Sequence, residues 1–242
     1  MTLIPVTRET LGHKRLKPQT SFAFAAKASL CGIVASEFAA IATNYPIFFI
    51  QQEGGFTPAA MLGLSGDDNL FVEADGGWSG GYVPGVFRSY PFFVQKDEAG
   101  APILVVDDQC DLLSDSEGEP LFGTDEASDL ASPVGRALHI ITQMDLETVP
   151  TRALIAKIAE TGIIQPINLA VDRSEAEKVV TGLHAINEAS LNALPDETLV
   201  DLRRAGALLP IYAHLVSMGQ VQQLKGRGRF RLALAAARNA QA

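Results

Sequence analysis

The chain of 242 residues is long enough to bury a sizeable core, as one large domain or two small ones. Its 47% hydrophobic and 19% charged residues are ordinary for a globular protein and exclude disorder across the whole chain. The net charge of −9 argues against nucleic-acid binding by the bulk of the protein, because phosphate contacts require Lys and Arg.

The first half of the chain predicts short strands separated by turns. Alternating or continuous apolar residues bounded by Gly, Ser, Asp and Asn are typical of strands and hairpins. The predicted strands are 21–27, 47–51, 59–64, 69–73, 92–96 and 103–107. We expect 59–64 to pair with 69–73, and 92–96 to pair with 103–107, because a turn signal separates the members of each pair.

Helices are predicted mainly in the second half. Two are expected earlier: 35–44, with Ser36 as a possible N-cap, and 80–90. The stretch 107–129 holds nine acidic residues and no basic one, and its Gly and Pro residues indicate a loop. After it, helices are expected from Pro133 to about 144, at 151–161, 187–194, 195–205 and 207–218, and weakly from 229. Strands 163–171 and 179–186 are expected to form a third hairpin around the polar residues 172–175.

This order of elements predicts an α+β fold with mostly antiparallel sheets, short packed helices and a helical C-terminal region. A division near residue 130 would give an N-terminal α+β part, 1–130, and a C-terminal α+β part, 131–225, together forming one continuous domain. Residues 226–242 form a basic tail that we expect to lie outside the domain, since 225–238 carries five basic residues and no acidic one.

Compartment signals are sparse. Cys31 and Cys110 are far apart in the sequence, so we favour free thiols in a reducing compartment over a disulfide framework. The N-terminal residues lack the apolar stretch of a secretory signal, and no window reaches the ~18 consecutive apolar residues of a membrane span. We therefore expect a soluble, cytoplasmic protein.

Neither HExxH, a P-loop lysine motif nor CxxC occurs, and we recognise no complete catalytic signature. None of the four histidines has a His or Cys neighbour at metal-ligand spacing, so we expect no metal and no cofactor. The acidic pairs in 107–129 can in principle hold a hard cation, but solvated loop carboxylates are the simpler interpretation. The sequence thus favours a non-catalytic protein over an enzyme.

Two clusters remain as candidate binding residues. His13, Arg15 and Lys17 belong to a polar N-terminal cluster that suits an anionic ligand, although the sequence favours a solvated arm or pairing with the acidic loop. The segment 69–93 is rich in glycine and aromatic residues and includes Arg88, a combination that suits a peptide, a sugar or a planar ligand. The alternative is a helix that packs its aromatic face into the core. The candidates in this segment are Trp78, Tyr82, Arg88 and Tyr90, and Tyr212 and His214 are polar exceptions on an apolar helix.

Short blocks of sequence carry a family resemblance. In chain order they are 13–18 (HKRLKP), 22–24 (FAF), 35–38 (ASEF), 45–47 (YPI), 69–72 (NLFV), 82–84 (YVP), 88–92 (RSYPF), 118–122 (GEPLF), 191–197 (LNALPDE) and 211–215 (IYAHL). Their order and number resemble the SapC family of bacterial proteins over about residues 3–224, with the tail after Gly226 outside the resemblance.

The resemblance implies an accessory role and supplies no catalytic residue. It suggests a link to nutrient uptake or to a halogenase-like or oxygenase-like partner protein, so we expect a non-catalytic protein that binds such a partner or a small ligand. One alternative is an enzyme whose site joins His13 and Arg88 to the acidic loop. Another is a structural component of a surface-layer assembly. The oligomeric state is left open.

Overall fold

The computed structural model describes residues 2–171 and 178–240. Contacts divide the chain into two compact units, each built from two stretches: unit 1 comprises Met1–Ser21 and Gly85–Leu146, and unit 2 comprises Phe22–Pro84 and Glu147–Ala242. The boundary expected near residue 130 falls inside unit 1. Antiparallel sheets combined with helices confirm the α+β class. The expected turn 172–175 lies outside the described residues.

The first sheet of unit 1 places the expected 92–96 and 103–107 hairpin beside the N-terminus. Its central strand is β7 (Pro102–Asp107), which pairs with β6 (Phe92–Lys96) on one side and β1 (Leu3–Pro5) on the other. All pairings are antiparallel, and Ile4 lies opposite Val106. The hairpin is therefore confirmed, and a strand that was not predicted completes the sheet.

A second small sheet orders much of the acidic stretch. In it, β2 (Arg15–Leu16) lies between β8 (Leu113–Ser114) and β9 (Glu119–Pro120). Three short helices accompany the two sheets: α1 (Arg8–Leu11), α3 (Gly85–Arg88) and α4 (Glu126–Ala131). The N-cap of α4 is Asp125, whose carboxylate accepts a hydrogen bond from the backbone N–H of Ser128.

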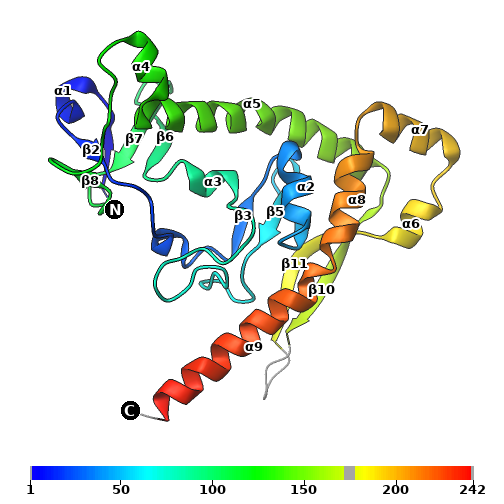
Figure 1. The fold of residues 1–242 in the computed structure, drawn as a ribbon. Helices are drawn as coiled ribbons and strands as arrows, with labels where there is room; N and C mark the ends of the chain where they lie inside the picture. Colours follow the sequence, from blue (N-terminus) through cyan, green and yellow to red (C-terminus); the bar gives the residue numbers. More distant parts are fainter. Residues whose placement is uncertain (1, 172–177, 241–242) are drawn as a thin grey trace. The chain divides into compact units, whose positions relative to one another are not determined.

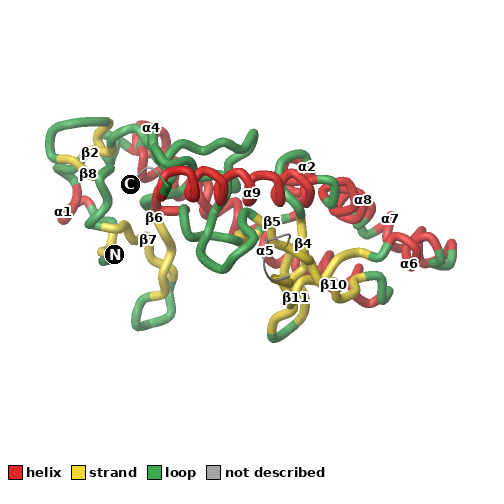
Figure 2. The backbone as a smooth tube through the Cα atoms, turned by 90° about the horizontal axis from the view of Figure 1, so that it is seen from below, coloured by secondary structure: helices red, strands yellow, loops and turns green. Residues whose placement is uncertain are grey.

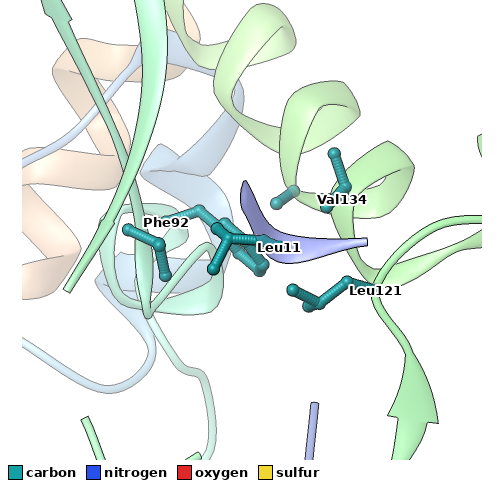
Figure 3. Packing of buried hydrophobic residues seen from close by; sticks show 6 residues of the cluster. Leu11, Phe92, Leu121 and Val134 are labelled. Atoms are coloured by element: carbon teal, nitrogen blue, oxygen red, sulfur yellow. The ribbon is translucent and has the colours of Figure 1, made fainter. Parts of the chain in front are cut away.

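An apolar cluster holds unit 1 together (Figure 3). Leu11 from α1, Phe92 from β6 and Leu121 from the loop after β9 are at most 4% exposed. Val106 from β7, with Val134 and Ala137, completes the cluster. Val134 and Ala137 come from the first turns of α5 (Pro133–Glu160), so the cluster joins side chains from both chain segments of the unit.

Unit 2 is built around a five-stranded antiparallel sheet whose strand order is β10-β11-β4-β5-β3. Figure 2 shows β4, β5, β10 and β11 gathered in one group. Glu53 and Gly54 form the turn between β4 and β5. Gly54 and Gly55, the first residue of β5, both have positive φ, a backbone conformation that residues with side chains disfavour. The strands are β3 (Leu30–Gly32), β4 (Ile47–Gln52), β5 (Gly55–Met61), β10 (Ile164–Val171) and β11 (Lys178–Ile186).

Helices cover this sheet with strongly apolar contacts. α2 (Phe38–Ala42) packs against α8 (Leu208–Ser217), as Figure 1 shows, and both contact β4. Phe38, Phe49 and Ile211 are completely buried in this layer. The other helical segments of unit 2 are the 3-10 turns η1 (Ala23–Ala25) and η2 (Ala35–Glu37) and the helices α6 (Glu188–Asn192), α7 (Asp196–Arg204) and α9 (Gln220–Asn239).

The helix α5 replaces two predicted helices. The sequence predicts one helix beginning at Pro133 and a second at 151–161, but the structure has a single helix of 28 residues that includes Pro150. The start is as expected, since the Ser132 hydroxyl accepts a hydrogen bond from the N–H of Gly135. Gly162, with φ of 73°, follows the last turn as predicted. A proline removes one backbone hydrogen bond, and here burial of Ile155 and Ile158 supports the helix beyond it.

Three local predictions in the first half are wrong. Residues 21–27 contain η1 and no strand, because the backbone N–H groups of Ala25 and Ala26 donate to the nearby carbonyls of Phe22 and Ala23 and not to a neighbouring strand. Residues 69–73 do not form a hairpin with 59–64; β5 pairs with β4 and β3, and Val72 makes only an isolated bridge to Trp78. Only Gly85–Arg88 of the expected helix 80–90 is helical, and the expected N-cap Ser36 lies within η2, whose N-cap is Val34.

Candidate functional site

A cavity of about 530 Å³ in unit 1 collects three of the residues singled out in the sequence. Lys17, Arg88 and Tyr90 all line it. Further polar groups on its wall come from Gln19, Glu119 and Arg136. Phe92, Pro133 and Ile140 form part of its apolar lining. The cavity therefore combines positive charge with apolar surface.

Local structure positions these side chains. The backbone N–H of Lys17 donates to Leu112, which extends the pairing of β2, and the Arg15 guanidinium donates to the carbonyl of Gly118 at 2.7 Å. Gly118 has φ of 99°, and a Cβ there would lie 2.2 Å from the carbonyl oxygen of Leu16, so glycine is required where the acidic loop meets β2. Arg88 is the last residue of α3. The Arg15 guanidinium thus contributes a contact that holds the loop, and its expected ligand-binding role stays a prediction.

An ion pair fixes one side of the cavity. Arg136 donates from both terminal nitrogens to Glu119, at 3.1 and 2.7 Å, which is the bidentate geometry typical of arginine and carboxylate. This hydrogen bonding holds the pKa of Glu119 below its ordinary value and raises the pKa of Arg136. The lining thus contains three cationic side chains, of which Arg136 is engaged by Glu119.

Two polar groups on the wall are neutral. The side-chain nitrogen of Gln19 is buried and has no hydrogen-bond partner among the described residues, so it is a donor left without an acceptor. Burial, together with the nearby Cys110 and Asp107, raises the pKa of Tyr90 to about 12. The phenol therefore remains protonated at neutral pH, and its ring makes an edge contact with Phe93 at 6.1 Å.

His13 is placed elsewhere in unit 1. It is exposed, it is absent from the cavity lining, and its Nε2 lies 3.6 Å from the carboxylate of Asp115. Lys14 lies 2.8 Å from the same carboxylate, and its hydrogen bond holds the pKa of Asp115 below the ordinary value. The N-terminal cluster thus pairs with the acidic loop, which is the alternative that the sequence left open.

Trp78 and Tyr82 belong to unit 2, where they form a hydrogen-bonded aromatic network. The Trp78 indole donates to the hydroxyl of Tyr45 at 2.9 Å and to the carbonyl of Tyr82 at 3.1 Å. The Tyr45 hydroxyl donates to the same carbonyl, and the Tyr82 hydroxyl donates to Glu37 at 2.9 Å. Tyr45 is completely buried, and Glu37 is 5% exposed. The aromatic face expected of a helix over 80–90 does not form, because neither Tyr82 nor Tyr90 lies in α3.

The two candidate residues on α8 differ in their burial. His214 is completely buried, and its Nε2 accepts a hydrogen bond from the backbone N–H of Ile186 at 3.0 Å. Burial lowers the pKa of His214 to about 4, so the imidazole is neutral and structural. Tyr212, two residues earlier, is 55% exposed on the outer side of the helix.

The basic tail is a helix that contacts unit 2. It forms most of α9, and the Arg227 guanidinium lies 4.5 Å from the ring centre of Phe71 and donates to the Ser79 hydroxyl at 2.9 Å. Arg231 donates to the Asp68 carboxylate at 2.9 Å and to the carbonyl of Val72 at 2.7 Å. These contacts hold the helix against residues on both sides of Trp78 in the sequence.

Sequence reasoning missed Gln19 and Arg136, and it considered Glu119 only as one of the carboxylates of the acidic loop. Gln19 directly follows the block 13–18, whereas Arg136 stands in a helix with no distinguishing pattern. Among the described residues, no group of three His, Cys, Asp or Glu side chains is placed to hold a metal ion. Within that part of the chain, no helix is both long and apolar enough to cross a membrane.

Comparison with known families identifies the chain. The family model named SapC matches residues 6–224, which is most of the sequence. The chain belongs to the SapC family. The matched region includes every lining residue of the cavity and the aromatic network of unit 2, and it ends within α9. No curated protein and no solved structure matches this SapC-family chain.

Proposed function

We propose that this SapC-family chain is a non-catalytic binding protein with an accessory role, and that the cavity of unit 1 is its ligand site. The observation that supports this most directly is the gathering of Lys17, Arg88 and Arg136 on one concave surface of a chain whose net charge is −9. Cations held around an apolar hollow suit an organic anion.

The lining suggests which part of such a ligand would contact polar groups and which part would contact apolar side chains. A carboxylate or phosphate accepts hydrogen bonds from guanidinium and ammonium groups, and the unpartnered amide of Gln19 supplies one more donor. Phe92 and Ile140 offer apolar contact to the remainder of the ligand. We therefore infer a small anion with an apolar or aromatic body.

The chemistry of the wall supports binding rather than catalysis. Tyr90 is held as a neutral phenol with a pKa of about 12, and the carboxylate of Glu119 is engaged by Arg136. A general base needs a pKa near the working pH, which neither group has. The alternative enzyme site of His13, Arg88 and the acidic loop has less support, since His13 lies against Asp115 and does not line the cavity.

Calorimetry and thermal-shift measurements test the ligand class. The probes are benzoate, phenyl phosphate, acetate and inorganic phosphate, with benzamide and benzyl alcohol as neutral counterparts. We expect the aromatic anions to bind, the neutral compounds to fail, and phenyl phosphate to be recovered unchanged. Substituting Lys17→Gln or Arg88→Gln should each weaken binding by about tenfold, because each removes one charged contact.

A matched control separates the cavity from general electrostatics. Lys14→Gln removes the same charge from a residue that pairs with Asp115 and does not line the cavity. This variant should bind the aromatic anions as tightly as the natural sequence. Equal weakening by all three substitutions, or equal binding of benzoate and benzamide, would contradict the proposal.

The partner is a second part of the proposal. The family resemblance motivates a halogenase-like or oxygenase-like protein as the recipient of the bound ligand. Pull-down of purified candidates with the full chain, with and without benzoate, tests this. If the chain binds neither candidate, the proposed partner is wrong and the proposed ligand site is unaffected.

A further inference from the structure

The outer side of α8 and α9 carries an uncharged stripe that the cavity does not explain. Leu209, Tyr212, Val216 and Phe230 are 61%, 55%, 65% and 71% exposed. They follow the alternating three- and four-residue steps of a seven-residue repeat, the spacing by which one helix packs along another. The complete stripe is Leu209, Tyr212, Val216, Gly219, Gln223, Gly226, Phe230 and Ala233.

The stripe lies opposite the side of the helices that packs on unit 2. His214, Val221 and Leu224 are buried at positions between the stripe residues. Only Met218 and Gly219 separate the two helices, and both keep right-handed helical backbone angles. Figure 1 shows α9 following directly on α8. The stripe therefore continues from one helix to the next.

We propose that this stripe is the contact surface for a second copy of the chain, with the two α8–α9 segments antiparallel. Along the stripe, large and small side chains are placed so that two antiparallel copies complement each other in size. An antiparallel arrangement centred near Val221 faces each stripe residue of one copy with a defined residue of the other. The facing pairs are Leu209 with Ala233, Tyr212 with Phe230, Val216 with Gly226, and Gly219 with Gln223.

In these pairs a large side chain meets a small one, or two aromatic rings meet. A glycine or alanine opposite Leu209 or Val216 leaves room for the larger side chain, so the helices can approach closely. Tyr212 and Phe230 occur twice in the symmetric dimer, and each pair can form an edge or stacked ring contact. A stripe that complements itself is what a two-fold contact requires.

Charge favours the antiparallel direction. Segment Leu208–Ser217 contains no Asp, Glu, Lys or Arg, whereas Gln220–Asn239 carries five basic residues and no acidic one. In a parallel pair the two basic segments would lie side by side, and like charges would repel. In the antiparallel pair each basic segment lies along the uncharged segment of the other copy.

Sedimentation and light scattering of the full chain test the pairing. We expect twice the chain mass of 25.8 kDa at 50 μM, and a monomer after Tyr212→Glu or Phe230→Glu, since the pair of Tyr212 with Phe230 occurs twice in the proposed contact. Leu232→Glu is the matched control, because Leu232 is 46% exposed on the same helix but lies off the stripe. The control variant should remain dimeric.

Cross-linking tests the direction. Both natural cysteines are buried, so a cysteine introduced on the stripe reacts alone. Tyr212→Cys together with Phe230→Cys should give a disulfide-linked dimer on mild oxidation. Phe230→Cys by itself should give none, because Phe230 faces Tyr212 and not its own copy.

Several outcomes would overturn the inference. These are a monomer at 50 μM, a dimer that survives both glutamate substitutions, or efficient cross-linking of Phe230→Cys alone. Binding of the monomer to vesicles of anionic lipid through Phe230 would likewise replace a second copy by a membrane surface. Each result is independent of ligand binding in the unit 1 cavity.

Discussion

The cavity of unit 1 and the aromatic network of unit 2 take residues from one stretch of sequence, 69–93, yet they use polar groups in opposite ways. In the network, the indole of Trp78 and the hydroxyls of Tyr45 and Tyr82 all donate to protein acceptors. In the cavity, the nitrogen of Gln19 has no acceptor among the described residues. Satisfied polar groups stabilise a fold, whereas a donor held ready on a concave wall is available to a ligand.

The largest effect should come from breaking the network at its centre. Trp78→Ala should lower the free energy of unfolding by about 3–4 kcal/mol, because it removes a large ring that contacts Phe22 and Tyr45 and donates two hydrogen bonds. Urea unfolding followed by circular dichroism measures this, since Trp78 is the only tryptophan. Trp78→Phe, which keeps a ring, should cost about half as much. A loss below 1 kcal/mol for Trp78→Ala would show that the network is not structural.

The second effect is the dependence of the free energy of unfolding on pH. His214 has a pKa of about 4 in the folded protein because burial disfavours the charged form, and about 6.5 when unfolded. The unfolded chain therefore binds the proton more readily between these values. Stability is fully present above pH 6.5 and is lost as the pH falls towards 4, by roughly 3 kcal/mol.

Unfolding free energies at pH 7.5 and 4.5 measure this loss. His214→Gln does not titrate, so its difference between the two pH values should be smaller than that of the natural sequence. His13→Gln serves as the control, because His13 is exposed and its removal should leave the difference unchanged. Identical differences for all three proteins would contradict a buried neutral His214.

A smaller effect is expected where α9 meets the loop before Trp78. Arg231→Gln should lower the free energy of unfolding by about 1–2 kcal/mol, because Asp68 and Val72 lose a charged donor that is one-third exposed. Arg238→Gln, an exposed arginine on the same helix, should change stability by less than about 0.5 kcal/mol. Equal effects of the two substitutions would argue against a specific role for Arg231.

The smallest effect is expected at the rim of the cavity. Glu119→Gln should cost only about 0.5 kcal/mol, since Glu119 and Arg136 are each 51% exposed. The pKa of Glu119 is lowered in the folded protein, so this contribution is present above its ordinary pKa and disappears as the pH falls through the folded value. Glu117→Gln removes an exposed neighbouring carboxylate as a control. A cost above 2 kcal/mol would mean that the ion pair is a core element of unit 1.

Local patterns predicted much of the fold correctly. The hairpins of β6 with β7 and of β10 with β11, and the helices α6, α7 and α8, follow from periodicity and turn residues. These local patterns could not predict the pairing of strands that are distant in the sequence. Nothing in the two residues Arg15 and Leu16 indicates that they form the central strand of a sheet with residues about a hundred positions later.

The candidate site was predicted only in part, because it too is formed by residues that are distant in the sequence. Lys17, Arg88 and Tyr90 were chosen for their chemistry, and tertiary structure brings them to one cavity with Arg136. His214 was chosen as a polar residue on an apolar helix, but that pattern does not distinguish a ligand-binding histidine from a buried one. Its hydrogen bond with Ile186 depends on β11, which the sequence of α8 cannot reveal.

The pairing of Leu3 with Asp107 has a consequence for the order of events during synthesis. The N-terminal segment of unit 1 leaves the ribosome before Phe22–Pro84 of unit 2, and its strand partners β7, β8 and β9 follow only afterwards. Loop closure over such a distance is entropically costly and slow. Residues 3–16 therefore lack their strand partners at a time when the β4–β5 hairpin can already form. We expect chaperone protection of the nascent chain to matter most for this N-terminal segment at that stage.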